Sequence, residues 1–213
     1  MNWKRRACPT LTANVPQCLL VPLGHTKGTR RQGGETIPLA QSLLFRYTKS
    51  SKGGGDMDHE YYMDLALELA REAVADGDVP VGCVIVKDGE VVGRGRNRRE
   101  ERGDATAHAE LEAIRDACAR LGSWRLHGCT MYVTLEPCPM CAGGIINARI
   151  ETVRYGARDE KAGCCASVLN LFEERFNHRP RIYEGPRKAE CEAILRDFFE
   201  NLRGGWTPEA AKK

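Results

Sequence analysis

The chain has 213 residues, of which 42% are hydrophobic, a length and composition that suit one globular domain with additional segments. The formal net charge of +3 is unevenly distributed: residues 1–56 carry nine Lys or Arg and two acidic residues, hence +7, which leaves −4 for residues 57–213. Overall charge therefore gives residues 57–213 no affinity for nucleic acid without a local basic surface, and no apolar run approaches the roughly 20 residues that span a bilayer.

Residues 1–56 lack any sustained helical or strand period and contain "TKGTRRQGG" and "KSSKGGGD". We interpret this segment as a disordered or non-native N-terminal extension. A targeting peptide is one explanation, because the segment is basic and poor in acids. We favour another: "KGGGDM" can be encoded by a purine-rich ribosome-binding sequence ahead of Met57, so that the biological chain starts at Met57. The mass of the natively expressed protein tests this, since a species that retains Met1 would contradict it.

Regular patterns begin after Met57. "HEYYMDLALELAREAVADG" has apolar residues at helical spacing and predicts a helix over 59–77, with Gly77 as its stop. "VPVGCVIVKDGEVVGRGRN" predicts a β-hairpin over 79–97 that turns at Asp88-Gly89. "AHAELEAIRDACARLG" predicts a second helix over 107–122, which ends at Gly122.

The second half of this region alternates strands and helices. We expect a buried strand over 129–137, a helix over 139–149, a strand over 150–157, a loop over 158–167, a short strand over 179–185 and a closing helix over 188–203. This order predicts an α/β fold of three α/β/α layers around a mixed, mostly parallel central sheet. We therefore expect residues 57–213 to form the functional domain.

The stretch "TLEPCPMCAGG" places Cys138 and Cys141 three residues apart, with a proline before and a proline within the pair. Pro139 suits the first position of a helix, which makes Cys138 the N-cap and Cys141 the third helical residue. Two thiolates on one tetrahedral zinc lie about 3.8 Å apart, a spacing that this geometry reaches. The positive end of the helix also favours the thiolate form.

Two sulfur ligands leave a zinc ion under-coordinated, and "DATAHAELEAI" offers His108 as a third ligand. Glu110 follows two residues later, and both side chains can face one metal only if His108 lies where its helix begins. Three protein ligands leave the fourth position to water, as in catalytic zinc sites. Glu110, which is not a ligand in this interpretation, can accept the proton of that water.

The main alternative for the metal is a structural four-cysteine site that uses Cys138, Cys141, Cys164 and Cys165. We consider it the weaker hypothesis, because adjacent cysteines are an awkward chelate and His108 would have no role. The chain has ten cysteines, which leaves six outside this set, and no stretch resembles the apolar region and cleavage site of a signal peptide. We therefore expect a reducing, cytoplasmic setting in which most other thiols are packed in the core.

The pattern H-x-E followed by P-C-x-x-C is the signature of zinc nucleobase deaminases. From about His59 to Arg203 the chain more narrowly resembles the bacterial tRNA-specific adenosine deaminases of the cytidine deaminase superfamily. The resemblance rests on "HEYYMDLALELAREA", "VPVGCVIV", "RNRREERGDATAHAELEAI", "YVTLEPCPMCAGGIINARI", "YGARDEKAGCCAS", "FNHRP" and "ECEAILRDFFENLR". It implies a cytidine-deaminase-like fold, one Zn²⁺ per subunit, and hydrolytic conversion of the wobble adenosine of an arginine tRNA to inosine.

The resemblance also implies residue roles and a partner. His108, Cys138 and Cys141 would ligate zinc, and Glu110 would move protons. The flipped base would accept or donate hydrogen bonds at Asn97. The anticodon backbone or a ribose would be contacted by a second set of residues, namely Arg158, Asp159 and Lys161. The family is homodimeric, and the second subunit helps to form the RNA site.

Two points depart from the family or stay open. The loop after Lys161 reads "AGCCAS", where the family commonly has small residues, and we expect Cys164 and Cys165 to be tolerated there. Phe198 and Phe199 either shape the groove for flanking nucleotides or are buried in the last helix. A free-base or nucleoside deaminase, for guanine or cytosine, is the alternative function. A zinc-containing RNA-binding module without catalysis is a second alternative.

Overall fold

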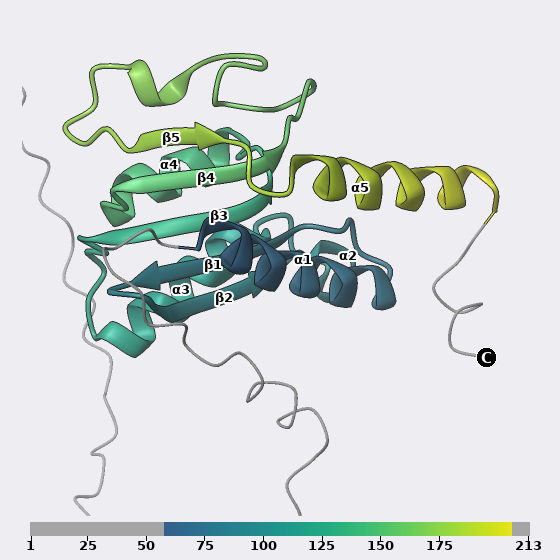
Figure 1. The fold of residues 1–213 in the computed structure, drawn as a ribbon, viewed down its shortest axis with the longest axis horizontal. Coiled ribbons are helices and arrows are strands. Elements are labelled where there is room, and N and C mark those ends of the chain that lie inside the picture. The colour runs from purple at the N-terminus through teal and green to yellow at the C-terminus, as the bar shows by residue number, and fades with distance from the viewer. Residues whose placement is uncertain (1–57, 206–213) are drawn as a thin grey trace, which may run out of the picture. The chain divides into compact units, whose positions relative to one another are not determined.

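The computed structural model describes residues 58–205, so the predicted N-terminal extension lies outside the described residues (Figure 1). Five strands form one sheet in the order β2-β1-β3-β4-β5. Their bounds are Gly82–Lys87 for β1, Glu90–Arg96 for β2, Cys129–Leu135 for β3, Thr152–Ala157 for β4 and Arg181–Glu184 for β5.

Strand direction brings four carboxyl ends to one edge of the sheet. β1 is antiparallel to both of its neighbours, β2 and β3, whereas β3–β4 and β4–β5 are parallel pairs. β2, β3, β4 and β5 therefore run in the same direction and β1 runs against them. The predicted mixed, mostly parallel sheet is confirmed. Ligand sites of open α/β sheets lie at the carboxyl ends of the strands.

Helices cover both faces of the sheet, which makes the three layers expected from the sequence (Figure 1). α1 (His59–Ala75) and α5 (Lys188–Arg203) lie on one face, and α3 (Ala109–Leu121) and α4 (Pro139–Ala148) on the other. Strand alternation explains the two layers of core. Cys83 and Ile85 of β1 pack with α3 and α4, and Val84 and Val86 pack with α1.

Local features at the ends of these elements include one cap that was not predicted and two predicted signals, the Asp88-Gly89 turn and the Gly122 helix end, which are confirmed. The Asp58 carboxylate accepts a hydrogen bond from the Tyr61 N–H at 3.0 Å and caps the start of α1. At the hairpin turn, Asp88 and Gly89 have φ angles of 51° and 83°, the left-handed pair that a two-residue turn of this kind requires. Gly122, at φ 61°, ends α3.

α3 lies unusually close to β2. A Cβ at Gly95 would overlap the Ala109 carbonyl oxygen and lie 2.5 Å from the Ala113 nitrogen, and a Cβ at Gly93 would lie 2.5 Å from the Ala113 carbonyl oxygen. Only glycine allows the helix backbone to approach the strand to this distance. The start of α3, which carries His108, is thereby fixed against the sheet.

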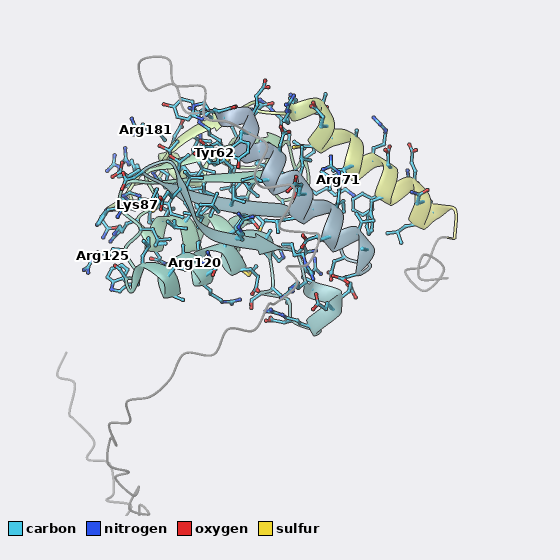
Figure 2. All side chains as sticks on the ribbon, turned by 60° about the horizontal axis from the view of Figure 1, so that its bottom comes forward. Tyr62, Arg71, Lys87, Arg120, Arg125 and Arg181 are labelled. Carbon is cyan, nitrogen blue, oxygen red and sulfur yellow. The ribbon has the colours of Figure 1, made fainter. Side chains whose placement is uncertain are left out.

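Two short elements were not predicted. α2 (Arg99–Arg102) and the 3₁₀-helix η2 (Leu171–Glu173) each last about one turn, too short for a hydrophobic period to mark them. None of the helices in the described part of the chain is long and apolar enough to cross a membrane. Figure 2 shows polar side chains, among them Lys87, Arg120, Arg125 and Arg181, on the outside of the layers.

Candidate metal centre

Two helix starts bring the predicted ligands together. His108 is the N-cap of α3 and Cys138 is the N-cap of α4, and both have extended backbone angles. Pro139 occupies the first position of α4, and Cys141 follows in its first turn. His108 therefore lies where its helix begins, the condition under which His108 and Glu110 can face one point.

The distances fit one tetrahedral metal. The Nδ1 atom of His108 lies 3.8 Å from the Cys138 sulfur and 3.5 Å from the Cys141 sulfur, and the three donor atoms lie within 4.8 Å of one another. Bonds of about 2.0–2.1 Å to nitrogen and about 2.3 Å to sulfur place tetrahedral ligands roughly 3.6 Å apart. One nitrogen and two sulfurs are a donor set that zinc prefers.

The sulfur pair favours negative charge. The Cys141 thiol donates to the Cys138 sulfur, which lowers the pKa of Cys138 to about 4 and raises the pKa of Cys141. The pKa of His108 is raised, chiefly by its hydrogen bond to Cys138. A divalent cation would replace the shared proton, because metal binding to thiols releases protons.

Glu110 lies in the first turn of α3 and is 4% exposed. Burial raises the pKa of its carboxyl group to about 7, to which the charge of Cys138 adds, while His108 lowers it. The carboxyl group is thus within electrostatic reach of the ligands but outside the cluster of three donors. A carboxyl group with a pKa near 7 is suited to general acid–base catalysis.

The ligand cluster opens into a cavity of about 710 Å³ at the carboxyl edge of the sheet. Residues from both covering layers and from the loops after β2 and β4 contribute to its wall. They include Val79, Asn97, Arg99, His108, Glu110, Glu136, Cys138, Arg158, Asp159, Lys161, Lys188 and Phe199. All eight residues singled out from the sequence, except the buried Cys141, line this one cavity.

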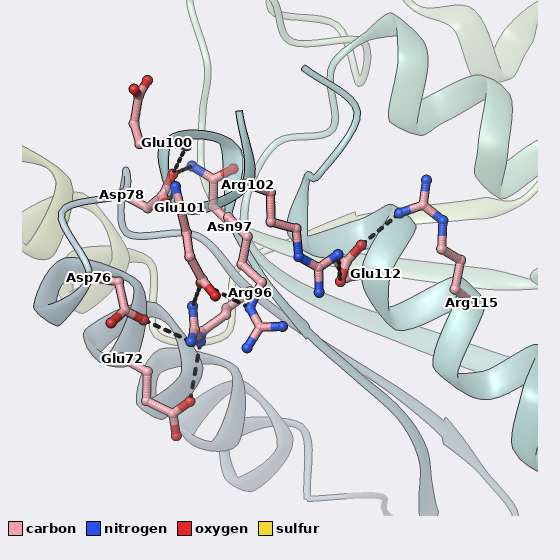
Figure 3. Close-up of polar contacts among 11 residues, drawn as sticks. Glu72, Asp76, Asp78, Arg96, Asn97, Glu100, Glu101, Arg102, Glu112 and Arg115 are labelled. Atoms are coloured by element: carbon pink, nitrogen blue, oxygen red, sulfur yellow. Dashed lines mark hydrogen bonds and ion pairs between the residues drawn. The ribbon is translucent and has the colours of Figure 1, made fainter. Parts of the chain in front are cut away.

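Asn97 follows β2 and is 5% exposed. Its Nδ2 atom donates a long hydrogen bond of 3.5 Å to Asp78, which is fully buried (Figure 3). The Asp78 carboxylate also accepts from the backbone N–H groups of Glu100 at 2.9 Å and Glu101 at 3.1 Å. Asp78 therefore holds both the Asn97 amide and the start of α2.

An ion-pair network supports the same wall from outside (Figure 3). The Arg96 guanidinium contacts Asp76 at 2.7 Å and Glu101 at 2.9 Å, and Glu72 at 3.6 Å. The side chain of Arg96 is only 14% exposed, so these pairs are shielded more than ordinary surface pairs. The network joins the end of α1 to α2.

The loop after β4 contributes the other predicted RNA contacts. Arg158 donates to the Glu184 carboxylate at 3.0 and 2.7 Å, so its guanidinium is anchored to the end of β5. One Asp159 oxygen accepts from the backbone N–H groups of Lys161 at 2.9 Å and Ala162 at 3.2 Å. Arg158 and Lys161 are exposed. These residues lie on the cavity rim, where a polyanion could reach them.

The alternative four-cysteine site is not assembled. Within the described residues the cluster of metal-ligand type is His108, Cys138 and Cys141, and the Cys164 thiol instead faces the Ala162 carbonyl oxygen at 3.6 Å. The two phenylalanines of α5 separate: Phe199 is 43% exposed and lines the cavity, whereas Phe198 is 4% exposed. Arg71 of α1 lies with Phe198 in a second groove between α1 and α5 (Figure 2).

Sequence reasoning missed Asp78 and Glu136, two buried carboxylates that hold the cavity walls. Glu136 stands directly before the Pro-Cys motif, and Asp78 follows Gly77, which was predicted to end α1 but lies two residues beyond its last residue, Ala75. An acidic residue at the end of an apolar strand was the available signal for Glu136. Its hydrogen-bond donors lie 23 to 31 residues further along, so no local pattern could identify them.

Comparisons with known proteins agree with this site. The model of the MafB19-like deaminase family matches residues 57–203. The tRNA-specific adenosine deaminase of Bacillus subtilis is 48% identical over 68% of this chain and 90% of its own length. The enzyme of that name from Aquifex aeolicus is 45% identical over 69% of this chain and 97% of its own length. A solved structure of a tRNA:A34 deaminase, studied for A-to-I editing at the wobble position of tRNA, is 46% identical, covers 63% of this chain and 99% of that chain, and superimposes with a TM-score of 0.62.

Proposed function

Because the chain belongs to the tRNA-specific adenosine deaminases, within the MafB19-like deaminase family, we propose that it converts adenosine to inosine at the wobble position of a tRNA anticodon. The observation that carries this function is the cluster of His108, Cys138 and Cys141 beside the buried Glu110 in one cavity. Zinc nucleobase deaminases use this set of groups, a metal with three protein ligands and a separate carboxyl group, for hydrolytic deamination.

We infer one Zn²⁺ per subunit as the cofactor, which His108, Cys138 and Cys141 would hold. When bound, the ion supplies a Lewis acid that activates water for attack on C6 of the purine. The remaining chemistry belongs to the chain. Glu110 takes one proton from the water and delivers it to N1. It then takes the proton of the hydroxyl added at C6 and gives it to the departing amine, which leaves as ammonia while C6 becomes a carbonyl.

Asn97 binds the base. Its Nδ2 atom is held by Asp78, so the carbonyl oxygen and the second N–H remain for the flipped adenine. A base of the anticodon loop is extruded at little unstacking cost, because the loop is single-stranded. Burial of Asn97 at 5% exposure keeps water from competing for these hydrogen bonds.

The RNA backbone is bound by Arg158 and Lys161 on the rim and by Asp159, which can accept from a ribose hydroxyl. These side chains extend the site beyond one nucleotide, as an anticodon loop of an arginine tRNA requires. The enzyme works as a homodimer in the cytoplasm. Exposed apolar side chains that a second copy would cover include Met140, Val168 and Leu169, and sedimentation equilibrium measures this association.

A substrate panel tests the function. Purified, zinc-loaded protein is incubated separately with an arginine tRNA anticodon stem-loop, guanine, cytosine and cytidine, and the products are identified by mass spectrometry. We expect inosine in the RNA and no conversion of the free compounds. Conversion of guanine or cytidine but not of the RNA would support the free-base or nucleoside alternative. Tight RNA binding without ammonia release would support the binding module.

A further inference from the structure

Glu136 is a buried carboxylate at the end of β3 whose hydrogen bonds all go to the loop after β4. It is 2% exposed. One oxygen accepts from the backbone N–H groups of Cys165 at 2.6 Å and Ser167 at 3.2 Å. The other accepts from the Asp159 N–H at 3.1 Å and from the Ser167 hydroxyl. Four donors from three loop residues therefore converge on one carboxylate.

This carboxylate depends on the loop for its stability. A buried carboxylate is costly unless it is paired or hydrogen-bonded. The cation that follows β4, Arg158, pairs with Glu184 at 2.7 Å instead. Among the described residues the loop N–H groups and the Ser167 hydroxyl therefore supply the stabilisation of Glu136. Conversely, these groups would lose their acceptor if the loop moved.

The backbone around Glu136 makes the same connection. The Cys164 N–H donates to the Pro137 carbonyl oxygen at 2.9 Å, and the Glu136 N–H donates to the Ala157 carbonyl oxygen at 2.9 Å. The loop also approaches Glu136 closely at Gly163, where a Cβ would overlap the Glu136 carboxyl group and lie 2.5 Å from the Asp159 carbonyl oxygen. Residues 136 and 137 thus hold the loop, and the next residue, Cys138, is a proposed metal ligand.

We propose that Glu136 is a positioning residue, which fixes the loop bearing Arg158, Asp159 and Lys161 to the metal-binding turn and so sets the RNA contacts at a constant distance from the reacting base. The substrate part of this inference rests on the proposed function. The tether, by which we mean the hydrogen bonds between Glu136 and the loop after β4, does not depend on the proposed function. Glu136 touches neither base nor metal in this account, so its removal weakens RNA binding more than it slows the reaction of bound RNA.

Glu136→Gln tests the tether with almost no change in shape. The amide keeps one oxygen that can accept hydrogen bonds. Its NH₂ group can only donate, so the backbone N–H groups that face it lose their acceptor. The matched control is Thr134→Val on the same strand. Thr134 is fully buried, and its hydroxyl accepts a hydrogen bond from the Gly82 N–H at 3.1 Å. This contact joins β3 to β1 and does not involve the loop after β4. The control therefore loses a buried hydrogen bond and stability without releasing the loop.

Three measurements separate positioning from a general loss of structure. Zinc content should stay at one per chain in Glu136→Gln. The KM for the anticodon stem-loop should rise tenfold or more, with kcat within about threefold of wild type. Trypsin under native conditions should cut after the exposed Lys161 at least tenfold faster in Glu136→Gln than in wild type or Thr134→Val.

Gly163→Ala perturbs the same contact from the loop side, because its Cβ would displace the loop from a Glu136 side chain that is chemically unchanged. It should give the same rise in KM and the same cleavage, and it carries the test alone if Glu136→Gln does not fold. Three outcomes in these variants would overturn the inference. They are an unchanged KM, a loss of zinc with a fall in kcat as large as the rise in KM, and cleavage after Lys161 no faster than in Thr134→Val. Failure of the wild type to edit RNA would instead refute the proposed function, while the cleavage comparison would still decide the tether.

Discussion

At the scale of single residues, the site depends on two helix N-caps. An N-cap residue has non-helical backbone angles, so its side chain points back over the helix start rather than along the helix surface. His108 and Cys138 both occupy this position, and their helices begin near the same edge of the sheet. The ligand spacing therefore follows from backbone geometry at two capping positions, with Cys141 added from the first turn of α4.

Replacement of Cys138 by alanine should remove the metal. Loss of one of three protein ligands leaves two, which is too few for stable zinc binding. Cys83→Ala is the control, because Cys83 is a fully buried thiol of β1 outside the ligand cluster. Elemental analysis after gel filtration should give less than about a tenth of a zinc per chain for Cys138→Ala and one for Cys83→Ala. Equal zinc in both variants would contradict the ligand assignment.

Asn97→Ala should lower kcat/KM for the stem-loop by roughly 10- to 100-fold, since a lost hydrogen bond to a buried substrate costs about 1–3 kcal/mol. The metal content should not change, because Asn97 is not a ligand. Asn201→Ala, at an exposed position of α5, is the matched control and should retain full kcat/KM. Steady-state kinetics of both variants decide the point, and equal values for the two would remove Asn97 from base recognition.

Residue-level prediction from sequence had a clear limit. The proposed zinc ligands could be predicted, although His108 lies 30 residues before Cys138, because each belongs to a short motif at a recognisable helix start. Asp78 and Glu136 could not, because their partners are up to 31 residues away and only the sheet brings them together. The anchoring of Arg158 by Glu184 was hidden for the same reason, since β4 and β5 pair across a long loop.

At the scale of elements, close contact between α3 and β2 fixes the position of His108, the first proposed metal ligand. Glycines at 93 and 95 allow this approach, and both were within the predicted hairpin. Periodicity predicted the helices and strands that have at least one complete buried face. It could not predict α2, because four residues, none of them buried, carry no hydrophobic period.

Gly95→Ala should destabilise the fold by about 1–3 kcal/mol, because its Cβ overlaps the backbone of α3 and forces the helix away from β2. The same shift should weaken zinc binding, since His108 begins that helix. Gly143→Ala is the control: it lies in α4 with open space at its Cβ position and should keep or raise the Tm. Thermal unfolding with and without a chelator measures both effects. A Gly95→Ala variant as stable as wild type would contradict the packing argument.

The ion pairs of Glu184 should add stability that depends on pH. Hydrogen bonds from Arg158, and then from Lys188, lower the pKa of Glu184 from its ordinary value of 4.5 to about 2. A lowered pKa in the folded state stabilises the fold above pH 4.5, and this contribution is lost as the pH falls towards 2. Urea unfolding of wild type and Glu184→Gln should therefore differ most above pH 4.5, and the difference should shrink below it. A difference that is constant with pH would contradict this assignment.

At the scale of the whole molecule, strand direction creates the site. Four strands end at one edge, where the loops after β2 and β4, the turn after β3 and the start of α5 line a common cavity. The alternation of strands and helices predicted the three layers, but the meeting of these loops is a property of strand order. Every site residue lies within residues 58–205.

A chain that begins at Met57 should therefore keep the fold and the activity. We expect the 57–213 protein to match the full chain in Tm within about 2 °C, in zinc content and in kcat/KM for the stem-loop, because each residue assigned a role lies after Met57. Side-by-side calorimetry and kinetics measure this. A large loss of activity on truncation would give residues 1–56 a role in the enzyme that the proposed domain boundary denies them.

We propose an active centre in which a metal held by His108, Cys138 and Cys141 works with a separate proton-transferring carboxyl group at Glu110. Glu110→Gln tests it most directly, because the amide retains the size of the side chain but cannot exchange the proton. Inosine formed at the wobble position of the stem-loop is counted under single-turnover conditions, with the zinc content of each sample measured in parallel. We expect one zinc per chain in both proteins and a rate at least about 1000-fold lower in the variant, which is the order of magnitude expected for general acid–base catalysis. Loss of zinc in Glu110→Gln, or inosine formation at the wild-type rate, would contradict it.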